Sequence, residues 1–186
     1  MKILITGPFS TGKTTLVRQL AQAMQSRAMD VSIVEDVARG CPLPLNENQD
    51  LATSCWLLGE QIRQEALALR TSPRLIICDR GIPDFVAHTL YAQDEHQTPD
   101  AHLADAFWGT SVAWSSTYDV VFQTHVEAVH IEPDGIRSED VEYQRRMDAY
   151  ATKAASTLEI SPIPLPASTE ARLQMVLDTI DAGDRS

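Results

Sequence analysis

The chain has 186 residues, which is enough for one medium-sized α/β domain and too few for two to be expected. Its 15 lysines and arginines against 26 aspartates and glutamates give a formal net charge of −11, which disfavours a general nucleic-acid or anionic-membrane binder. Hydrophobic residues make up 44% and charged residues 22%, values typical of folded water-soluble proteins, so disorder over most of the length is excluded.

Cysteine usage and the N-terminal residues indicate a reducing compartment. The three cysteines, Cys41, Cys55 and Cys78, are an odd number without C-x-x-C spacing, so neither a disulfide framework nor a structural zinc site is indicated. The apolar run 3–5 breaks at Gly7, which makes it too short for a signal peptide, and no apolar run is long enough for a membrane span. We expect a cytoplasmic protein with no nucleic-acid or membrane partner; the sequence leaves the oligomeric state open, a homo-oligomer included.

The first quarter of the chain predicts a strand, a turn and a helix, followed by a second strand. Residues 1–6 form the first strand, and the apolar positions after them recur at helical spacing in a helix that ends before Asp30. Residues 31–35 predict the second strand. Residues 39–45 contain proline and glycine and predict an irregular loop.

A long helix and a buried strand follow this loop. Asn46, with Gln49 three residues later, predicts a capping box for a helix that reaches about Arg70. Residues 75–78 are a continuous apolar run, typical of a strand buried on both faces. Pro83 then suits the first turn of another helix.

The second half repeats the alternation of helices and strands. A helix is predicted after Asp100, and residues 118–123 predict a fourth strand. Ser138 is the predicted cap of the next helix, and residues 158–163 predict a fifth strand that ends before Pro164.

The last helix has the clearest pattern, with apolar residues at i, i+3, i+4 and i+7 from Leu173. Five short strands separated mostly by helices predict one α/β domain over residues 1–186, with a five-stranded parallel sheet and helices on both faces. Ligands of such sheets bind beyond the carboxyl ends of the strands.

The strongest motif lies at the end of the first predicted strand. Residues 7–14 match G-x-x-x-x-G-K-S/T between a strand and a helix, the context that a phosphate-binding loop requires. The glycines let backbone amides point at phosphate oxygens, Lys13 adds a charge for the β- and γ-phosphates, and Thr14 offers a hydroxyl to Mg²⁺. We expect ATP to contact these residues: Gly7, Ser10, Thr11, Gly12, Lys13, Thr14 and Thr15.

Asp79 ends the third predicted strand and is similar to a Walker B carboxylate, which holds Mg²⁺ beside the phosphate-binding loop. With Thr14 it forms the predicted metal site. An ordinary turn residue after a buried strand remains the alternative.

Three further segments carry a family resemblance that covers nearly the whole chain. Residues 34–39 (Val-Glu-Asp-Val-Ala-Arg), 79–81 (Asp-Arg-Gly) and 134–137 (Asp-Gly-Ile-Arg), with the phosphate-binding loop, resemble the AAA-type P-loop family that includes nicotinamide riboside kinase domains. The resemblance implies a three-layer P-loop NTPase fold with a helical lid at about residues 127–150. It also implies a kinase of the nucleoside and nucleotide branch.

The family usually has glutamate where Asp36 stands, so the neighbouring Glu35 competes with Asp36 for the role of base. Neighbours in a strand point to opposite faces, and Asp36 is preferred because it lies three residues before Arg39, as in the family pattern. Two solvated acids at a strand end remain the alternative.

Phosphoryl transfer needs an aligned hydroxyl, a carboxylate near it, and cations for the developing charge. Asp36 would accept the proton of the acceptor, Arg39 and Arg80 would hold the acceptor or its phosphates, and Arg137 would close over the transferring group. With Lys13, the predicted catalytic residues are Asp36, Arg80 and Arg137. Two later arginines are alternative lid cations: Arg145 and Arg146.

Three functions remain open from the sequence. The first is a kinase that moves the ATP γ-phosphate to a hydroxyl of a nucleoside-like acceptor with Mg²⁺. The second is a regulatory NTPase that switches shape on hydrolysis. ATP is favoured over GTP as its nucleotide, because residues 152–155 lack the aspartate of the guanine motif N-K-x-D. The third is a nucleotide-binding module without chemistry. Acid–arginine pairs near two strand ends favour the kinase, and Trp56 is a minor candidate for stacking on a base.

Overall fold

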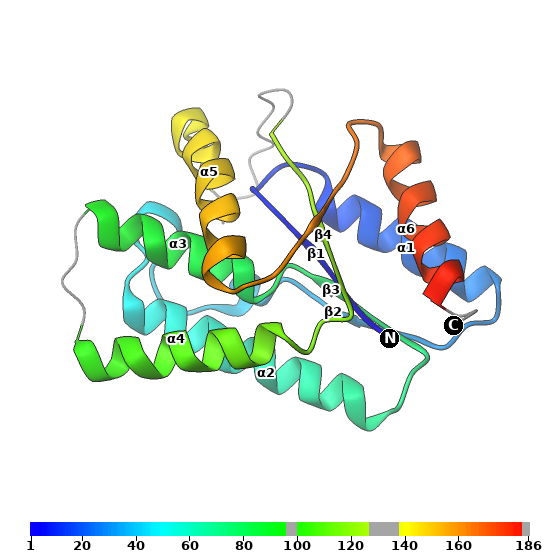
Figure 1. Cartoon of the computed structure of the whole chain (residues 1–186), viewed down its shortest axis with the longest axis horizontal. Helices are drawn as coiled ribbons and strands as arrows, with labels where there is room; N and C mark the ends of the chain where they lie inside the picture. The colour runs from blue at the N-terminus through cyan, green and yellow to red at the C-terminus, as the bar shows by residue number, and fades with distance from the viewer. Residues whose placement is uncertain (96–99, 127–137, 184–186) are drawn as a thin grey trace.

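The structure is a computed structural model, and it describes residues 1–95, 100–126 and 138–183. A five-stranded parallel sheet in the order β2-β3-β1-β4-β5 lies at its centre (Figure 1). Its strands are β1 (Lys2–Thr6), β2 (Val31–Val34), β3 (Leu75–Asp79), β4 (Val120–Gln123) and β5 (Ile163–Pro164). The α-helices are α1 (Lys13–Ser26), α2 (Leu51–Arg70), α3 (Ile82–Glu95), α4 (Ala101–Ser115), α5 (Val141–Thr157) and α6 (Thr169–Gly183), and the 3-10 helices are η1 (Val37–Gly40) and η2 (Asn46–Asn48).

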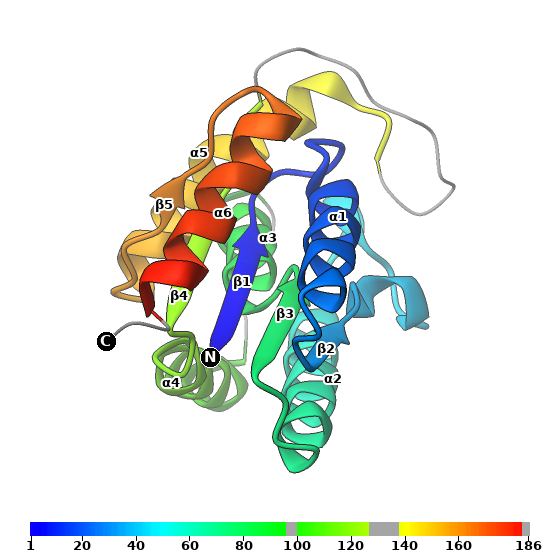
Figure 2. The same ribbon diagram turned by 90° about the vertical axis from the view of Figure 1, so that its right-hand side faces the viewer.

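The alternation of side chains along β1 divides the core into two layers. Ile3 and Ile5 pack with residues of α1 and α6, whereas Leu4 faces the opposite side of the sheet. Helices α2 to α5 lie on that second side, while Figure 2 shows α1 and α6 in front of the sheet. The predicted parallel sheet with helices on both faces is confirmed.

All strands run parallel, so their carboxyl ends meet at one edge of the sheet. The loop after β1, the Asp79 end of β3 and the Gln123 end of β4 lie at this edge, which is where such folds bind ligands. Among the described residues, no helix combines the length and the apolar character that crossing a membrane requires.

The predicted capping box at Asn46 and Gln49 is wrong. Helix α2 begins after Asp50, whose carboxylate accepts a hydrogen bond from the amide of Thr53 at 2.7 Å. Asn46 instead opens η2, and Gln49 is buried, with its side-chain Nε2 donating to the hydroxyl of Ser54 at 3.0 Å. A short carboxylate next to the first turn satisfies the orphan amides more directly than Asn46 can.

The predicted cap of the lid helix is also displaced, because Asp140 and not Ser138 precedes α5. The Asp140 carboxylate accepts from the amides of Glu142 and Tyr143 at 2.7 and 3.2 Å. Ser138 donates to the carboxylate of Glu47 on η2. A charged oxygen at the helix start adds a favourable interaction with the helix dipole.

The fifth strand is shorter and later than predicted. Residues 158–162 are not a strand, since Leu158 ends α5, and β5 consists of Ile163 and Pro164 alone. Pro164 lies inside the strand that it was expected to stop. β5 is an edge strand, where a proline can be accommodated, and the next amide, of Leu165, donates to the Gln123 carbonyl at 2.8 Å.

A buried carboxylate joins α2 to the underside of the sheet. Glu65 accepts from Lys2 Nζ at 2.6 Å, from Trp114 Nε1 at 2.8 Å, from the Tyr118 hydroxyl at 2.7 Å and from Gln61 Nε2 at 2.8 Å. Glu65 and Gln61 have no exposed surface. Four donors balance the desolvation of this charge, as a buried carboxylate requires.

We expect Glu65→Gln to lower the free energy of unfolding by about 2–3 kcal/mol, because it leaves the buried Lys2 ammonium without its charged partner. Urea denaturation measures the effect. The matched control is Glu60→Gln on the same helix, whose partner Arg63 is exposed, and its expected cost is below about 1 kcal/mol. Equal costs for the two variants would contradict the role assigned to the Lys2–Glu65 pair.

Candidate functional site

The loop after β1 bends sharply at Gly7. This residue has a φ of +125°, and a methyl group on it would lie 2.3 Å from the carbonyl oxygen of Thr124 beyond β4. Both facts restrict the position to glycine. The loop ends at Gly12, φ +83°, which opens α1 without a capping side chain among the described residues. The start of α1 therefore has the features of an anion site.

Lys13 is buried at this turn and its side chain folds over the loop. The ammonium donates to the carbonyl oxygens of Gly7, at 2.6 Å, and of Pro8. Phosphate oxygens carry more negative charge than these carbonyls and are stronger partners for an ammonium. Thr14 is half-buried in the first turn of α1 and Thr15 is exposed.

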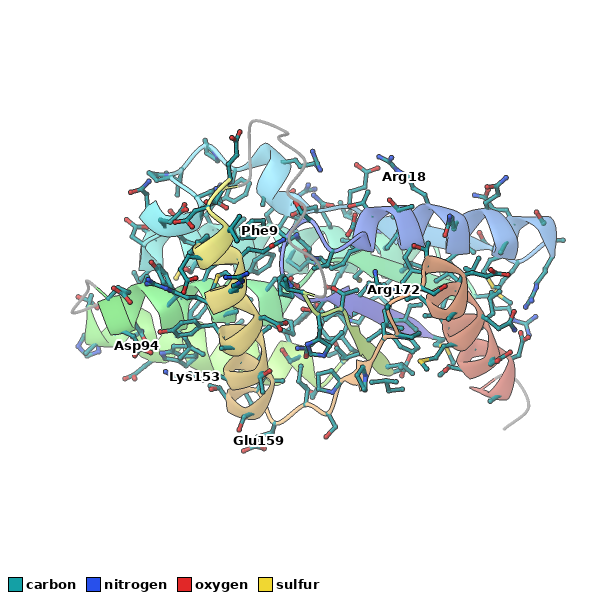
Figure 3. The ribbon with its side chains drawn as sticks, turned by 90° about the horizontal axis from the view of Figure 1, so that it is seen from above. Phe9, Arg18, Asp94, Lys153, Glu159 and Arg172 are labelled. Atoms are coloured by element: carbon teal, nitrogen blue, oxygen red, sulfur yellow. The ribbon has the colours of Figure 1, made fainter. Side chains whose placement is uncertain are left out.

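Side chains from both layers hold the loop in shape. Arg172 of α6 is buried and donates to the carbonyl oxygen of Thr11 at 2.6 Å and to that of Pro166 at 2.5 Å. Gln144 of α5 donates to the carbonyl oxygen of Phe9 at 2.8 Å. Figure 3 shows Phe9 beside α5, and Arg172 on α6 near α1, so the loop is held from two sides.

Asp79 lies beside this loop, because the register of the sheet pairs it with Ile5. The side chain is buried, and its Oδ1 atom has no hydrogen-bond partner among the described residues. A buried carboxylate oxygen without a donor fits a cation, and Mg²⁺ prefers oxygen ligands supplied by one or two side chains together with phosphates and water. Asp79 and the Thr14 hydroxyl thus fit a Mg²⁺–nucleotide. Within the described ranges, no three His, Cys, Asp or Glu residues form a metal cluster of their own.

A buried ion cluster follows Asp79 in the sequence. Arg80 Nε lies 3.1 Å from Asp36 Oδ2, and Arg80 Nη1 lies 3.2 Å from Asp84 Oδ1. None of the three side chains is more than 8% exposed. The backbone of Arg80 has a φ of +72°, a strained conformation for a residue with a side chain. The cluster brings the ends of β2 and β3 together.

Asp84 also ties this cluster to the phosphate-binding loop. Besides Arg80, its two oxygens accept from the Thr6 hydroxyl at 2.8 Å, from the Gly7 amide at 3.3 Å and from the Gly81 amide at 3.0 Å. Burial raises the pKa of Asp84, which the charges of Arg80 and Lys13 oppose. Because every one of these partners is a donor, the geometry fits the ionised carboxylate.

A pocket of about 460 Å³, including open space at its mouth, lies between the loop and this cluster. We call it the side pocket. Its polar lining comes from the ion cluster, two amides and a histidine, and its apolar lining includes a residue of the phosphate-binding loop. The lining residues are Phe9, Asp36, Ala38, Leu45, Asn46, Gln49, Leu57, Arg80, Asp84, Phe85 and His88.

His88 lines the side pocket, and its Nδ1 lies 2.6 Å from the hydroxyl of Tyr143 on α5. Burial, followed by the positive charge of Arg80, lowers the pKa of His88 to about 3. The imidazole is therefore neutral at pH 7.

The neutral state of His88 predicts acid sensitivity. An unfolded histidine binds a proton near pH 6.5, so between pH 6.5 and about 3 the unfolded chain carries a proton that folded His88 does not. The free energy of unfolding should fall as the pH drops through this window, by at most about 1.4 kcal/mol per pH unit from this residue. Urea denaturation from pH 7 to 4.5 measures the slope. This slope should flatten in His88→Gln and stay unchanged in His102→Gln, which alters an exposed residue of α4. Identical slopes in the two variants would refute the neutral state assigned to folded His88.

The structure brings some predicted residues together and separates others. Asp36 and Arg80 meet in the side pocket, whereas Glu35 and Arg39 are exposed and are not among its described lining residues. Arg145 and Arg146 are exposed on α5 and lie near carboxylates, 3.9 Å from Glu142 in both cases. Trp56 is half-buried and packs against the cluster of Val37, Leu57 and Phe85. Arg137 and the rest of 127–137 lie outside the described residues.

Four residues of the site were not anticipated from the sequence. Asp84 directly follows Pro83 and looks like an ordinary acid in the first turn of a helix. Arg172 and Gln144 have no motif, because each acts through a backbone carbonyl of a distant segment. His88 lacks metal-ligand spacing. The one sequence signal that these four residues share is a polar side chain next to apolar residues of a helix. This signal does not show which distant segment the side chain contacts.

Residues 2–172 match the AAA domain family. Among solved structures, deoxyadenosine kinase from M. mycoides with bound dCTP has a TM-score of 0.67 at 14% identity, covering 98% of this chain and 100% of that chain. Its dATP complex has a TM-score of 0.64 at 16% identity, covering 97% and 99%. Thymidylate kinase from Ehrlichia chaffeensis has a TM-score of 0.62 at 17% identity, covering 96% and 98%. No curated protein sequence matches the chain. At these identities the likeness shows the fold.

Proposed function

The chain belongs to the AAA domain family, and from this premise we propose that it is a kinase that transfers the γ-phosphate of ATP to a hydroxyl of a nucleoside-like acceptor. The observation that carries the proposal is the position of Asp36. This buried carboxylate lines a pocket whose wall includes Phe9 of the phosphate-binding loop. A protein that only switches shape on hydrolysis needs no such acceptor site. The fold that the chain shares with deoxyadenosine kinase and thymidylate kinase supports the proposal.

In this mechanism the phosphate-binding loop positions the triphosphate. The amides of the loop and the first turn of α1 donate to phosphate oxygens, and Lys13 moves its donors from the loop carbonyls to the β- and γ-phosphates. Thr14 and Asp79 would hold Mg²⁺, which supplies positive charge against the phosphate oxygens when bound.

The acceptor, bound in the side pocket, reacts with the γ-phosphate. The acceptor oxygen forms a bond to the γ-phosphorus, the bond from that phosphorus to the β,γ-bridging oxygen breaks, and the hydroxyl proton passes to Asp36. The products are ADP and a phosphomonoester. Arg80, 3.1 Å from Asp36, orients this carboxylate.

We further propose that residues of about 127–150 act as a lid on a single domain. Two described features support this placement. Ser138 donates to Glu47 of η2, so this residue of the segment contacts the loop that borders the side pocket. Tyr143 and Gln144 at the start of α5 pack against the phosphate-binding loop. The role of Arg137 stays a prediction.

A coupled assay of ADP release with Mg²⁺-ATP tests the proposal. The panel contains nucleosides, nicotinamide riboside and small alcohols. We expect slow basal release and a large stimulation by at least one nucleoside. Release that no acceptor stimulates would favour a regulatory ATPase, and no release at all would favour a binding module.

A further inference from the structure

Arg80 is the one arginine or lysine among the described residues that line the side pocket. Its guanidinium lies between two carboxylates, with Nε 3.1 Å from Asp36 and Nη1 3.2 Å from Asp84. An acceptor that enters the pocket therefore meets a cation that is already neutralised by two acids.

The two acids cannot easily give up this cation. Asp84 is fixed by donors from Thr6, Gly7 and Gly81 as well as by Arg80. Asp36 is fixed by its hydrogen bond from the Ala38 amide at 3.2 Å. Releasing Arg80 toward a ligand would leave buried carboxylates with weaker partners, which is costly.

Among the described lining residues, two carboxylates and one guanidinium give a formal charge of −1, and the His88 imidazole adds no charge. A phosphate monoester brings a charge of about −1.5 to −2 at pH 7. Placed in a buried site beside like charges, such a group is strongly disfavoured.

The rest of the lining suits an uncharged ring compound. Phe85 and Leu57 supply apolar walls, and Asn46 and Gln49 supply amide groups.

We propose that Asp36 and Asp84, by holding Arg80 between them, make the side pocket selective for acceptors without a phosphate group, such as free nucleosides, over their monophosphates. This inference rests on the proposed kinase function and deepens it. Arg80 then acts as a positioning residue for the two carboxylates, and Asp84 is a determinant of specificity.

The test compares each nucleoside with its own 5′-monophosphate, for the four deoxynucleosides and the four ribonucleosides. Acceptor-stimulated ADP release gives kcat/KM for each member of a pair, and calorimetry gives the dissociation constant without turnover. For the preferred pair we expect the nucleoside to exceed its monophosphate by at least about 100-fold. A monophosphate that is used or bound as well as its nucleoside overturns the inference. If neither series stimulates release, the kinase proposal fails, and the calorimetric preference still decides the selectivity of the pocket.

Two variants test whether charge is the cause. Asp84→Asn removes one negative charge and should shift the preference at least about 10-fold toward the monophosphate, whereas Asp94→Asn, an exposed acid on the same helix, should not. If Asp84→Asn does not fold, Leu45→Lys adds a cation at the half-buried edge of the pocket, and Leu45→Met is its uncharged control. If the preference between nucleoside and monophosphate shifts by the same factor in a variant and in its control, the inference is overturned.

Discussion

Replacing Asp36 by asparagine is expected to lower turnover by about 10²–10⁴-fold while leaving the affinity for ATP nearly unchanged. Asparagine keeps the volume of the side chain and can still accept from the Ala38 amide. It cannot accept the proton of the acceptor hydroxyl. In the proposed mechanism ATP affinity is retained because the phosphate-binding loop, and not Asp36, holds the nucleotide.

Glu35→Gln is the matched control, because Glu35 is the neighbouring acid and is exposed. Turnover with the preferred acceptor and ATP titration are measured for both variants. Loss of turnover in Glu35→Gln with none in Asp36→Asn would show that Glu35, and not Asp36, is the base. A loss of ATP affinity that equals the loss of turnover would show that Asp36 acts on the nucleotide.

Replacing Lys13 by alanine is expected to weaken ATP binding by about 100-fold or more. Each charge-assisted hydrogen bond from a buried ammonium to a phosphate contributes roughly 1.5–3 kcal/mol, which is about 10- to 150-fold in the dissociation constant. Lys13 is almost fully buried and already points into the loop. The described residues of the loop include no other cation that could replace it. Calorimetric titration with Mg²⁺-ATP measures the change.

Lys153→Ala is the control for the loss of a lysine, since Lys153 is half-exposed on α5 and pairs with Asp94. Thermal unfolding of the Lys13→Ala variant separates a binding defect from a folding defect. Unchanged ATP affinity and unchanged turnover in a folded Lys13→Ala variant would rule out the phosphate-binding loop as the nucleotide site.

The sequence predicts the parts of this protein that depend on local pattern. The glycine and lysine spacing of residues 7–14 defines the loop, because each position has its own steric or charge requirement. The apolar runs 3–5 and 75–78 identify strands that the structure buries at the centre of the sheet. The preference for Asp36 over Glu35 comes from its spacing to Arg39 in the family pattern, and among the described lining residues of the side pocket only Asp36 of the two is present.

Features that depend on distant partners are not predictable in this way. Asp84 looks like an ordinary helix acid until the fold brings it to Thr6 and Gly7. β5 is short and contains Pro164, so it is a strand only because it pairs with the end of β4. Asp50 and Asp140 cap their helices in place of the predicted Asn46 and Ser138, because the backbone geometry decides which side-chain oxygen reaches the first amides of a helix.

The most direct test of the account is the fate of the γ-phosphate. Phosphorus NMR of a reaction with Mg²⁺-ATP and the best acceptor of the panel resolves ADP, inorganic phosphate and a phosphomonoester. The kinase proposal predicts that phosphomonoester forms in a one-to-one ratio with ADP, with inorganic phosphate as a minor product. ADP accompanied by an equal amount of inorganic phosphate, whatever acceptor is added, would contradict it.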